Sequence, residues 1–105
     1  MAKFQPQFVK VYKIKIGVIG AGYISQVCHL PFLAKNNHCE IKAIIEKNEN
    51  LLNKVADKYK IKNRFKNYQE IVEKKVKLDA VFICVNKFLA SEITHFFLKN
   101  KIAVF

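Results

Sequence analysis

Arginine is nearly absent from this chain, since Arg64 is the only arginine among 19 basic residues and the other 18 are lysines. Proteins that recognise nucleic acids favour arginine, because its planar guanidinium bonds phosphates and base edges through two N–H groups at once. The lysines are also spread along the whole sequence, without the continuous basic helix or arm of a nucleic-acid-binding protein. The formal charge of +11 therefore indicates a solvated surface, and we expect no nucleic-acid partner.

Long apolar stretches are missing too. No apolar run approaches the ~20 residues that a helix needs to cross a bilayer. Residues 1–7 lack the apolar core of a secretory signal. We therefore expect a cytoplasmic protein with no membrane partner.

Cysteines are few, and their pattern predicts neither disulfides nor a metal site. Cys28, Cys39 and Cys84 are odd in number and lack metal-ligand spacing, so we expect reduced thiols, with Cys84 in a buried strand. His38 precedes Cys39 but has no further candidate ligands nearby. No nucleophile–base pair or carboxylate pair is recognisable either, and we expect no catalytic residue in these 105 residues.

Only three glycines occur, and two of them form one motif. An apolar strand pattern at 14–19 runs into Gly20-Ala21-Gly22 and then into a helix. Gly20 can make a tight turn, and Gly22 lets a phosphate approach the backbone because no Cβ intervenes. The following helix directs N–H groups and the positive end of its dipole at an anion. The motif predicts a site for a dinucleotide pyrophosphate beside Tyr23. S-adenosylmethionine is a competing ligand that fits the immediate helix entry less well.

Strands and helices alternate from residue 13 onward, which predicts βαβ units. The result is an α/β fold with a doubly wound parallel sheet in the order 3-2-1-4-5 and helices on both faces. Residues 1–12 are predicted to be an N-terminal extension, with an added edge strand as one option, and 13–105 a dinucleotide-binding domain. The expected strands are 14–19, 41–45, 64–66, 80–85 and 102–105, and the expected helices are 23–35, 49–59, one capped by Asn67 and Glu70, and 89–99.

Several features of the helices can be predicted in more detail. Pro31 is expected to kink the first helix, and Asn100 to end the last helix in the left-handed conformation. Asn48 is the expected N-cap of the second helix. The apolar positions predicted to form the inner face of the first helix are Ile24, Val27, Cys28, Leu30 and Leu33.

An acidic residue follows the second strand directly. Glu46 lies 26 residues after Gly20, close to the ~20 typical of the carboxylate that binds the ribose of a dinucleotide. Such a carboxylate accepts hydrogen bonds from the 2′- and 3′-hydroxyls and repels a 2′-phosphate, so NAD is the expected cofactor rather than NADP. Lys47 would soften that preference. The alternative is that Glu46 is a solvated loop residue.

The loop after the fourth strand is predicted to face the same site, because the strand order reverses there. It contains Val85, Asn86 and Lys87. Asn86 could hydrogen-bond the cofactor and Lys87 could meet a phosphate, although an ordinary loop role for each stays open. His29 and His95 are helical histidines, for which we expect structural roles.

These residues together resemble the N-terminal nucleotide-binding domain of the Gfo/Idh/MocA (glucose–fructose oxidoreductase / inositol dehydrogenase) family. The resemblance covers about 13–105 and rests on segments in the family's order. These are 17–24, His29-Leu30-Pro31, Ile44-Ile45-Glu46, 67–71, 79–84 and Leu98-Lys99-Asn100-Lys101.

The resemblance implies a Rossmann domain of an NAD(P)-dependent oxidoreductase that moves a hydride between C4 of a nicotinamide and a sugar, polyol or related substrate. By position, the residues implied for the pyrophosphate are Gly20, Gly22, Tyr23 and Ile24. Glu46 would hold the adenosine ribose, and Val85, Asn86 and Lys87 would form the loop across the sheet.

The chain departs from the family in two places. Residues 85–90 lack the family's Thr-Pro and following histidine, and the sequence stops at Phe105, before the family's Glu-Lys-Pro and its substrate domain. We therefore expect a cofactor-binding domain that does not catalyse alone and meets a small-molecule substrate only with a second domain. The alternative is a standalone dinucleotide-binding, sensing or protein-interaction module. The oligomeric state is not predicted.

Overall fold

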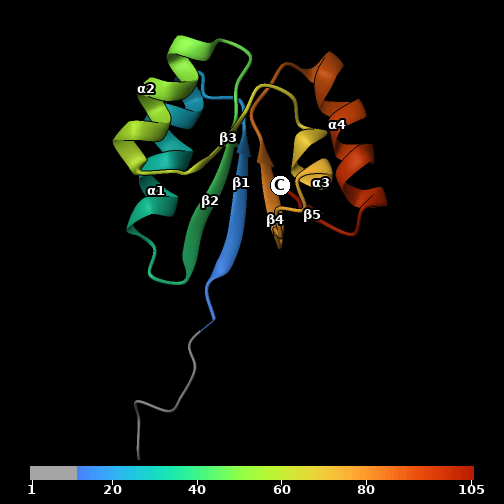
Figure 1. Cartoon of the computed structure of the whole chain (residues 1–105), viewed down its shortest axis with the longest axis horizontal. Helices are drawn as coiled ribbons and strands as arrows, with labels where there is room; N and C mark the ends of the chain where they lie inside the picture. Colours follow the sequence, from blue (N-terminus) through green and yellow to red (C-terminus); the bar gives the residue numbers. More distant parts are fainter. Residues whose placement is uncertain (1–11) are drawn as a thin grey trace, which may run out of the picture.

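The structure, a computed structural model, describes residues 12–105, so nearly all of the expected extension 1–12 lies outside the described residues. Five strands form one sheet in the order β3-β2-β1-β4-β5 (Figure 1), and every neighbouring pair is parallel. The predicted α/β fold and strand order are thus confirmed. The strands are β1 (Ile14–Ile19), β2 (Cys39–Ile45), β3 (Asn63–Phe65), β4 (Ala80–Ile83) and β5 (Ala103–Val104).

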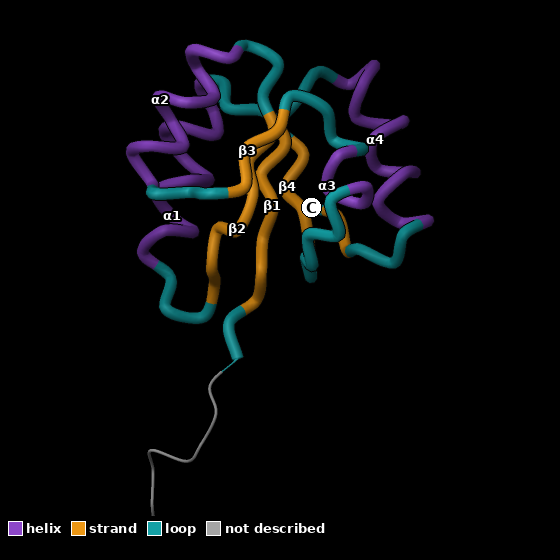
Figure 2. The backbone as a smooth tube through the Cα atoms, in the orientation of Figure 1, coloured by secondary structure: helices purple, strands orange, loops and turns teal. Residues whose placement is uncertain are grey.

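The helices cover both faces of the sheet, with α1 and α2 on one side and α3 and α4 on the other (Figures 1 and 2). This arrangement explains the unbroken apolar run of β4, since a strand covered on both faces needs no polar side. Within residues 12–105 no helix is long and apolar enough to cross a bilayer. The helices are η2 (Ser25–His29), α1 (Leu30–Lys35), α2 (Glu49–Tyr59), α3 (Glu70–Glu73) and α4 (Lys87–Lys99).

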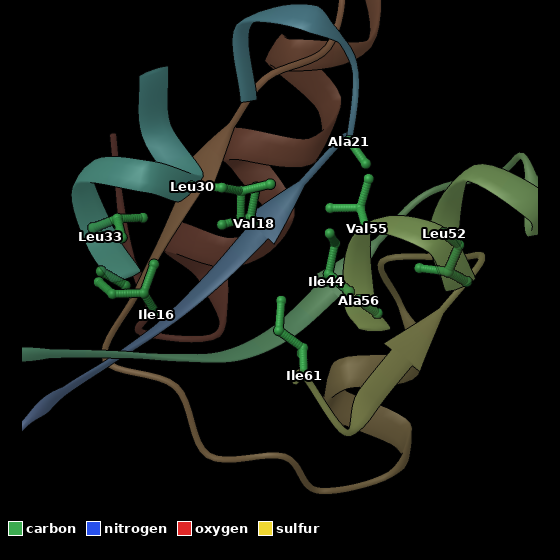
Figure 3. Close-up of a cluster of buried hydrophobic side chains, with 11 residues drawn as sticks. Ile16, Val18, Ala21, Leu30, Leu33, Ile44, Leu52, Val55, Ala56 and Ile61 are labelled. Carbon is green, nitrogen blue, oxygen red and sulfur yellow. The ribbon is translucent and has the colours of Figure 1, made fainter. Parts of the chain in front are cut away.

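Two buried clusters join the helices to the sheet. One lies against η2, α1 and α2 and contains Val18, Leu30 and Ile44, all fully buried (Figure 3). The other lies against α3 and α4 and contains Val81 and Phe97, again without exposed surface. Because β1, like its neighbours β2 and β4, carries side chains of both clusters, the glycine turn at its end starts from a strand packed on both faces.

The first helix differs from its predicted form. Its first part, η2, is a π-helix in which the N–H of Leu30 donates to the carbonyl oxygen of Ser25, and α1 then begins with Pro31 in its first turn, where a proline is tolerated. An i→i+5 turn takes one more residue than an α-turn, so the apolar stripe shifts. Ser25, Leu30 and Leu33 are buried, whereas the predicted core residues Ile24, Val27 and Cys28 are exposed.

Asparagine side chains start two helices. Oδ1 of Asn48 accepts a hydrogen bond from the N–H of Leu51 at 3.0 Å, so the structure has the predicted cap of α2. Oδ1 of Asn86 accepts from the N–H groups of Phe88 and Leu89, both at 3.1 Å. This second cap explains why α4 begins at Lys87, two residues before its predicted start.

The capping box predicted for α3 is only half formed. Oε2 of Glu70 accepts from the N–H of Asn67 at 3.3 Å, but the N–H of Glu70 donates to the backbone carbonyl of Asn67. The helix therefore begins at Glu70 and has four residues.

Lysines, not Asn100, take the left-handed conformation after three helices. Lys60, Lys75 and Lys101 have φ values of 57°, 56° and 62°, and they follow α2, α3 and α4. Asn100 has φ −92° instead, and its Nδ2 donates to the carbonyl oxygen of Phe96 at 2.8 Å. The amide side chain satisfies a carbonyl at the helix end, and the chain reverses one residue later than predicted.

Candidate cofactor-binding site

The turn that ends β1 requires glycine at its first position. Gly20 has φ +99°, a conformation that side chains disfavour, and a Cβ there would lie 2.6 Å from the carbonyl oxygen of Cys84. The turn passes this close to the end of β4 because the N–H of Cys84 donates to the carbonyl oxygen of Ile19 at 2.8 Å. The predicted tight turn at Gly20 is therefore a packing requirement of the fold.

Gly22 differs, because nothing in the protein crowds it. A Cβ on Gly22 would meet no atom within 4 Å, so the protein's own packing gives no reason for a glycine there. Tyr23 and Ile24 begin the helix beside it, with exposed fractions of 76% and 54%. N–H groups in a first helical turn have no intrahelical partner. The open space over Gly22 and these free donors fit an anionic phosphate.

Side chains of the following helix fix the backbone of the turn. The hydroxyl of Ser25, which is fully buried, donates to the carbonyl oxygen of Gly20 at 2.6 Å. Nε2 of Gln26 donates to the carbonyl oxygen of Ala21 at 2.8 Å. The N–H of Gly20 donates to the carbonyl oxygen of Ile45 at 2.7 Å. Ser25, at the third position of the glycine motif, thus supplies a hydrogen bond that glycine could not make.

Glu46 lies at the end of β2, next to this turn. Its Oε1 accepts a hydrogen bond from the N–H of Ala21 at 2.9 Å, and its Oε2 accepts from the N–H of Asn48 at 3.0 Å. The side chain is half-buried. The structure therefore brings the predicted carboxylate into direct contact with the predicted phosphate-binding turn, 25 residues earlier in the sequence.

A cleft of about 430 Å³ opens at this carboxyl edge of the sheet. Five of the nine predicted site residues line it, and these are Gly20, Glu46, Lys47, Val85 and Asn86. The other four, Gly22, Tyr23, Ile24 and Lys87, do not line it. Lys87 directly follows Asn86 at the start of α4, whereas Gly22, Tyr23 and Ile24 lie two to four residues after Gly20, at the end of the turn and the start of the helix.

The cleft also contains residues that the sequence did not predict. The loop after β3 belongs to it, because Ile45 of β2 pairs with Phe65 and the N–H of Glu46 donates to the carbonyl oxygen of Phe65 at 3.0 Å. One face of α4 forms another wall. The 3–4 spacing of the residues on this face could have predicted from the sequence that they lie together. The additional lining residues are Ile19, Ile45, Lys66, Asn67, Tyr68, Gln69, Leu89, Glu92 and Ile93.

Charge and burial in this region alter two titratable groups. Desolvation raises the pKa of the Tyr68 phenol, and the nearby charge of Glu92 raises it further. The pKa of the Cys84 thiol is raised by burial, and a hydrogen bond with Ser25 offsets part of that effect. Both groups therefore stay protonated at neutral pH, and neither supplies a charge to the site.

The loop after β4 has less freedom than predicted. Because Oδ1 of Asn86 caps α4, only the amide nitrogen of this side chain remains to donate to a ligand. Nζ of Lys87 lies 5.7 Å from the ring centroid of the exposed Phe88. His29 packs with its ring 5.4 Å from that of Phe82, as a structural histidine would. His95 is exposed on α4 and does not line the cleft.

No group of three or more His, Cys, Asp or Glu side chains in residues 12–105 is placed to hold a metal ion. The polar groups that line this edge are instead a carboxylate that accepts hydrogen bonds, and backbone N–H groups and lysines that donate them, with apolar walls between them. This set fits a dinucleotide, which combines a diol, a pyrophosphate and an apolar base face.

Comparisons with known proteins agree with this geometry. Residues 14–105 match the profile of the oxidoreductase family with an NAD-binding Rossmann fold, Gfo/Idh/MocA. A search of curated protein sequences found no significant match.

Solved structures provide further similarity. A Gfo/Idh/MocA family oxidoreductase from Vibrio cholerae is 28% identical, with a TM-score of 0.78 over 88% of this chain and 29% of that one. Two more distant structures share the fold. Apo scyllo-inositol dehydrogenase from Lactobacillus casei has 20% identity and a TM-score of 0.82 over 91% of this chain and 28% of its own. A variant 3-ketoreductase from Actinomadura kijaniata, in complex with TDP-benzene and NADP, has 23% identity and a TM-score of 0.80 over 88% and 29%.

The chain thus spans less than a third of the length of these proteins. The family profile, by contrast, covers nearly all of the residues that the structure describes. The chain therefore belongs to the Gfo/Idh/MocA oxidoreductase family and corresponds to its NAD-binding Rossmann domain.

Proposed function

We propose that this chain binds NAD at the carboxyl edge of its sheet, as the cofactor domain of an oxidoreductase acting on a sugar- or polyol-type substrate. The contact between the Glu46 carboxylate and the glycine turn is the observation that carries the proposal. It supports the proposal because a carboxylate that can accept hydrogen bonds from a ribose diol adjoins the glycine turn at which a pyrophosphate would bind.

Each part of the cofactor has a counterpart in the chain. The N–H groups of Gly22, Tyr23 and Ile24 would hold the pyrophosphate, since the helix start offers free donors and a positive dipole end. Glu46 would accept hydrogen bonds from the ribose hydroxyls. The adenine base would lie against the apolar cleft wall that includes Leu89. The bound nicotinamide supplies the hydride chemistry, and we propose that Val85, Asn86 and Lys87 contact that half of the cofactor.

NAD is the proposed cofactor rather than NADP. The Glu46 carboxylate repels the extra phosphate that NADP carries on the ribose. Lys47 and Lys66, which line the same cleft, reduce that repulsion without removing it. The expected preference is therefore moderate.

We infer that the substrate is bound by a second domain and that the 105 residues alone bind cofactor without turning over substrate. Two observations support this. The relatives are more than three times as long as the matched segment. Among the described residues, the cleft lining contains no histidine, and burial together with Glu92 raises the pKa of the Tyr68 phenol, which makes Tyr68 a poor proton acceptor.

Calorimetric titration tests the proposal. NAD should bind the chain, and NADP should bind several-fold more weakly. This order is diagnostic, because unspecific attraction to a chain of formal charge +11 would favour the more anionic NADP. Glu46→Ala should weaken NAD binding by about tenfold or more, as expected for lost hydrogen bonds to a charged group.

The matched control is Glu49→Ala, which removes an exposed carboxylate three residues away, in the first turn of α2. It should leave the affinity for NAD unchanged. Absence of binding of either dinucleotide at millimolar concentration would refute the proposal.

A further inference from the structure

Glu46 connects three segments of the chain even without a ligand. Its Oε1 accepts from the N–H of Ala21 in the glycine turn, and its Oε2 accepts from the N–H of Asn48, the N-cap of α2. One carboxylate at the end of β2 therefore joins that strand to the turn after β1 and to the start of α2. Each oxygen retains a further lone pair with which it could accept a bond from a ligand hydroxyl.

The bond to Ala21 completes the fixation of the turn. The N–H and carbonyl groups of Gly20 and the carbonyl of Ala21 are bonded to Ile45, Ser25 and Gln26. The N–H of Ala21 is the fourth backbone group, and Glu46 is its partner. Removing the carboxylate would leave this amide as the one backbone polar group of Gly20 and Ala21 without its bond.

The backbone orientation of Ala21 affects the proposed phosphate site because Gly22 follows it directly. No side-chain packing holds Gly22, since a Cβ there would meet no atom within 4 Å, so the peptide before it and the bond from the N–H of Gln26 to its carbonyl oxygen set the direction in which the chain enters the helix. That direction determines where the N–H groups of Gly22, Tyr23 and Ile24 point. These are the donors left for an anion, since the Ala21 N–H is already used by Glu46.

We propose that Glu46 is a positioning residue for the phosphate-binding turn as well as the ligand of the ribose, so that one carboxylate couples recognition of the diol to binding of the pyrophosphate. The proposal rests on the proposed function, because it assumes that a nucleotide binds at this edge. It assigns Glu46 an effect on phosphate binding that a ribose ligand alone would not have.

The first test needs no ligand. In ¹⁵N-labelled protein, Glu46→Ala should speed hydrogen exchange of the Ala21 amide by about tenfold or more and shift the resonances of residues 20–24. Glu46→Gln keeps a carbonyl oxygen that can accept from Ala21 and should restore much of the protection. Glu49→Ala should change neither signal. Unchanged exchange and unchanged resonances of the turn in Glu46→Ala would overturn the positioning role.

The second test separates the two roles with a pair of ligands. ADP carries the diol and the phosphates, whereas 2′,3′-dideoxy-ADP carries the phosphates without the diol. Removing the negative charge of Glu46 should by simple electrostatics strengthen binding of either anion. We instead expect Glu46→Ala to bind 2′,3′-dideoxy-ADP about fivefold more weakly than the parent, a typical coupling between sites.

Glu46→Gln should recover part of the affinity for 2′,3′-dideoxy-ADP, because it restores the acceptor without the charge. Equal or tighter binding of this ligand to Glu46→Ala would overturn the coupling. If Glu46→Ala fails to fold, Glu46→Gln alone tests the positioning role. This variant must keep the amide of Ala21 protected from hydrogen exchange. A parent chain that binds neither NAD nor ADP refutes the proposed function, whereas the ligand-free exchange measurement still tests the positioning role.

Discussion

The chain adopts positive φ values at both the carboxyl and the amino ends of its parallel strands, but it uses different residues at the two ends. At the carboxyl edge the chain needs one positive φ, and Gly20 supplies it, with side chains of Ser25 and Gln26 bonding the turn. At the amino edge three turns need a positive φ, and Lys60, Lys75 and Lys101 adopt it. A side chain in that conformation costs about 1 kcal/mol or more.

The difference shows where the fold tolerates strain. Lysines in exposed turns can carry a left-handed conformation, because their side chains extend into solvent and clash with nothing. Gly20 has no such option, since a Cβ would meet a backbone carbonyl that is itself fixed in the sheet. At the carboxyl edge the residue type is therefore fixed by sterics, whereas at the amino edge a side chain is tolerated at the cost of strain.

The largest expected effect is a loss of stability from a substitution at the carboxyl edge. Gly20→Ala should lower the free energy of unfolding by about 3 kcal/mol, because it adds a 2.6 Å clash to an unfavourable φ. Urea denaturation measures the loss. Gly22→Ala is the matched control and should change stability by less than about 1 kcal/mol while weakening NAD binding, since its Cβ enters the proposed phosphate site. Equal destabilisation by the two variants would contradict this distinction.

A smaller effect of opposite sign is expected at the amino edge. Replacing Lys60, Lys75 and Lys101 together by glycine should raise the free energy of unfolding by about 2 kcal/mol, because glycine adopts the left-handed conformation without penalty, while its larger conformational entropy in the unfolded chain offsets part of the gain. The three sites follow different helices, so their effects should add. Thermal unfolding at fixed ionic strength measures the gain. A triple Lys→Ala variant controls for the lost charge and should show no such gain.

The smallest effect concerns the cap at the carboxyl edge. Asn86→Ala should destabilise the chain by about 1 kcal/mol, since two N–H groups lose their acceptor. Asn48→Ala removes an acceptor of one side-chain bond and should cost less. Asn86→Asp should retain the cap. Denaturation curves should therefore show the largest loss of stability in Asn86→Ala, a smaller loss in Asn48→Ala and the smallest in Asn86→Asp. A larger loss in Asn48→Ala would show that the packing of α2, not capping, sets the difference.

Local patterns predicted most of the fold because they have local physical causes. The apolar runs of β1 and β4, the Asn48 cap and the glycine turn depend on residues close in sequence. Where the prediction was wrong, a neighbouring group had changed the local preference. The π-turn of η2 buried Ser25 in place of Ile24, and Asn100 bonded a carbonyl and left the reversal to Lys101.

The predicted site was less complete for a similar reason. Glu46 and the glycine turn could be found from their spacing, since a strand, a turn and a helix bring them to one edge. The loop after β3 could not, because its place in the cleft depends on the pairing of Ile45 with Phe65. The 3–4 spacing of α4 indicated an inner face, but whether that face borders the cleft depends on how α4 packs against the sheet.

The sequence by itself thus determined the strand order, because hydrophobic periodicity and right-handed crossovers leave few other arrangements. It also predicted the type of site and proposed Glu46 as its principal carboxylate. Only the tertiary structure decided that Glu46 bonds the amide of Ala21, that Gly20 is sterically required and that Gly22 lies under open space. These facts depend on distances between strands that are far apart in the chain, and no local pattern encodes those distances.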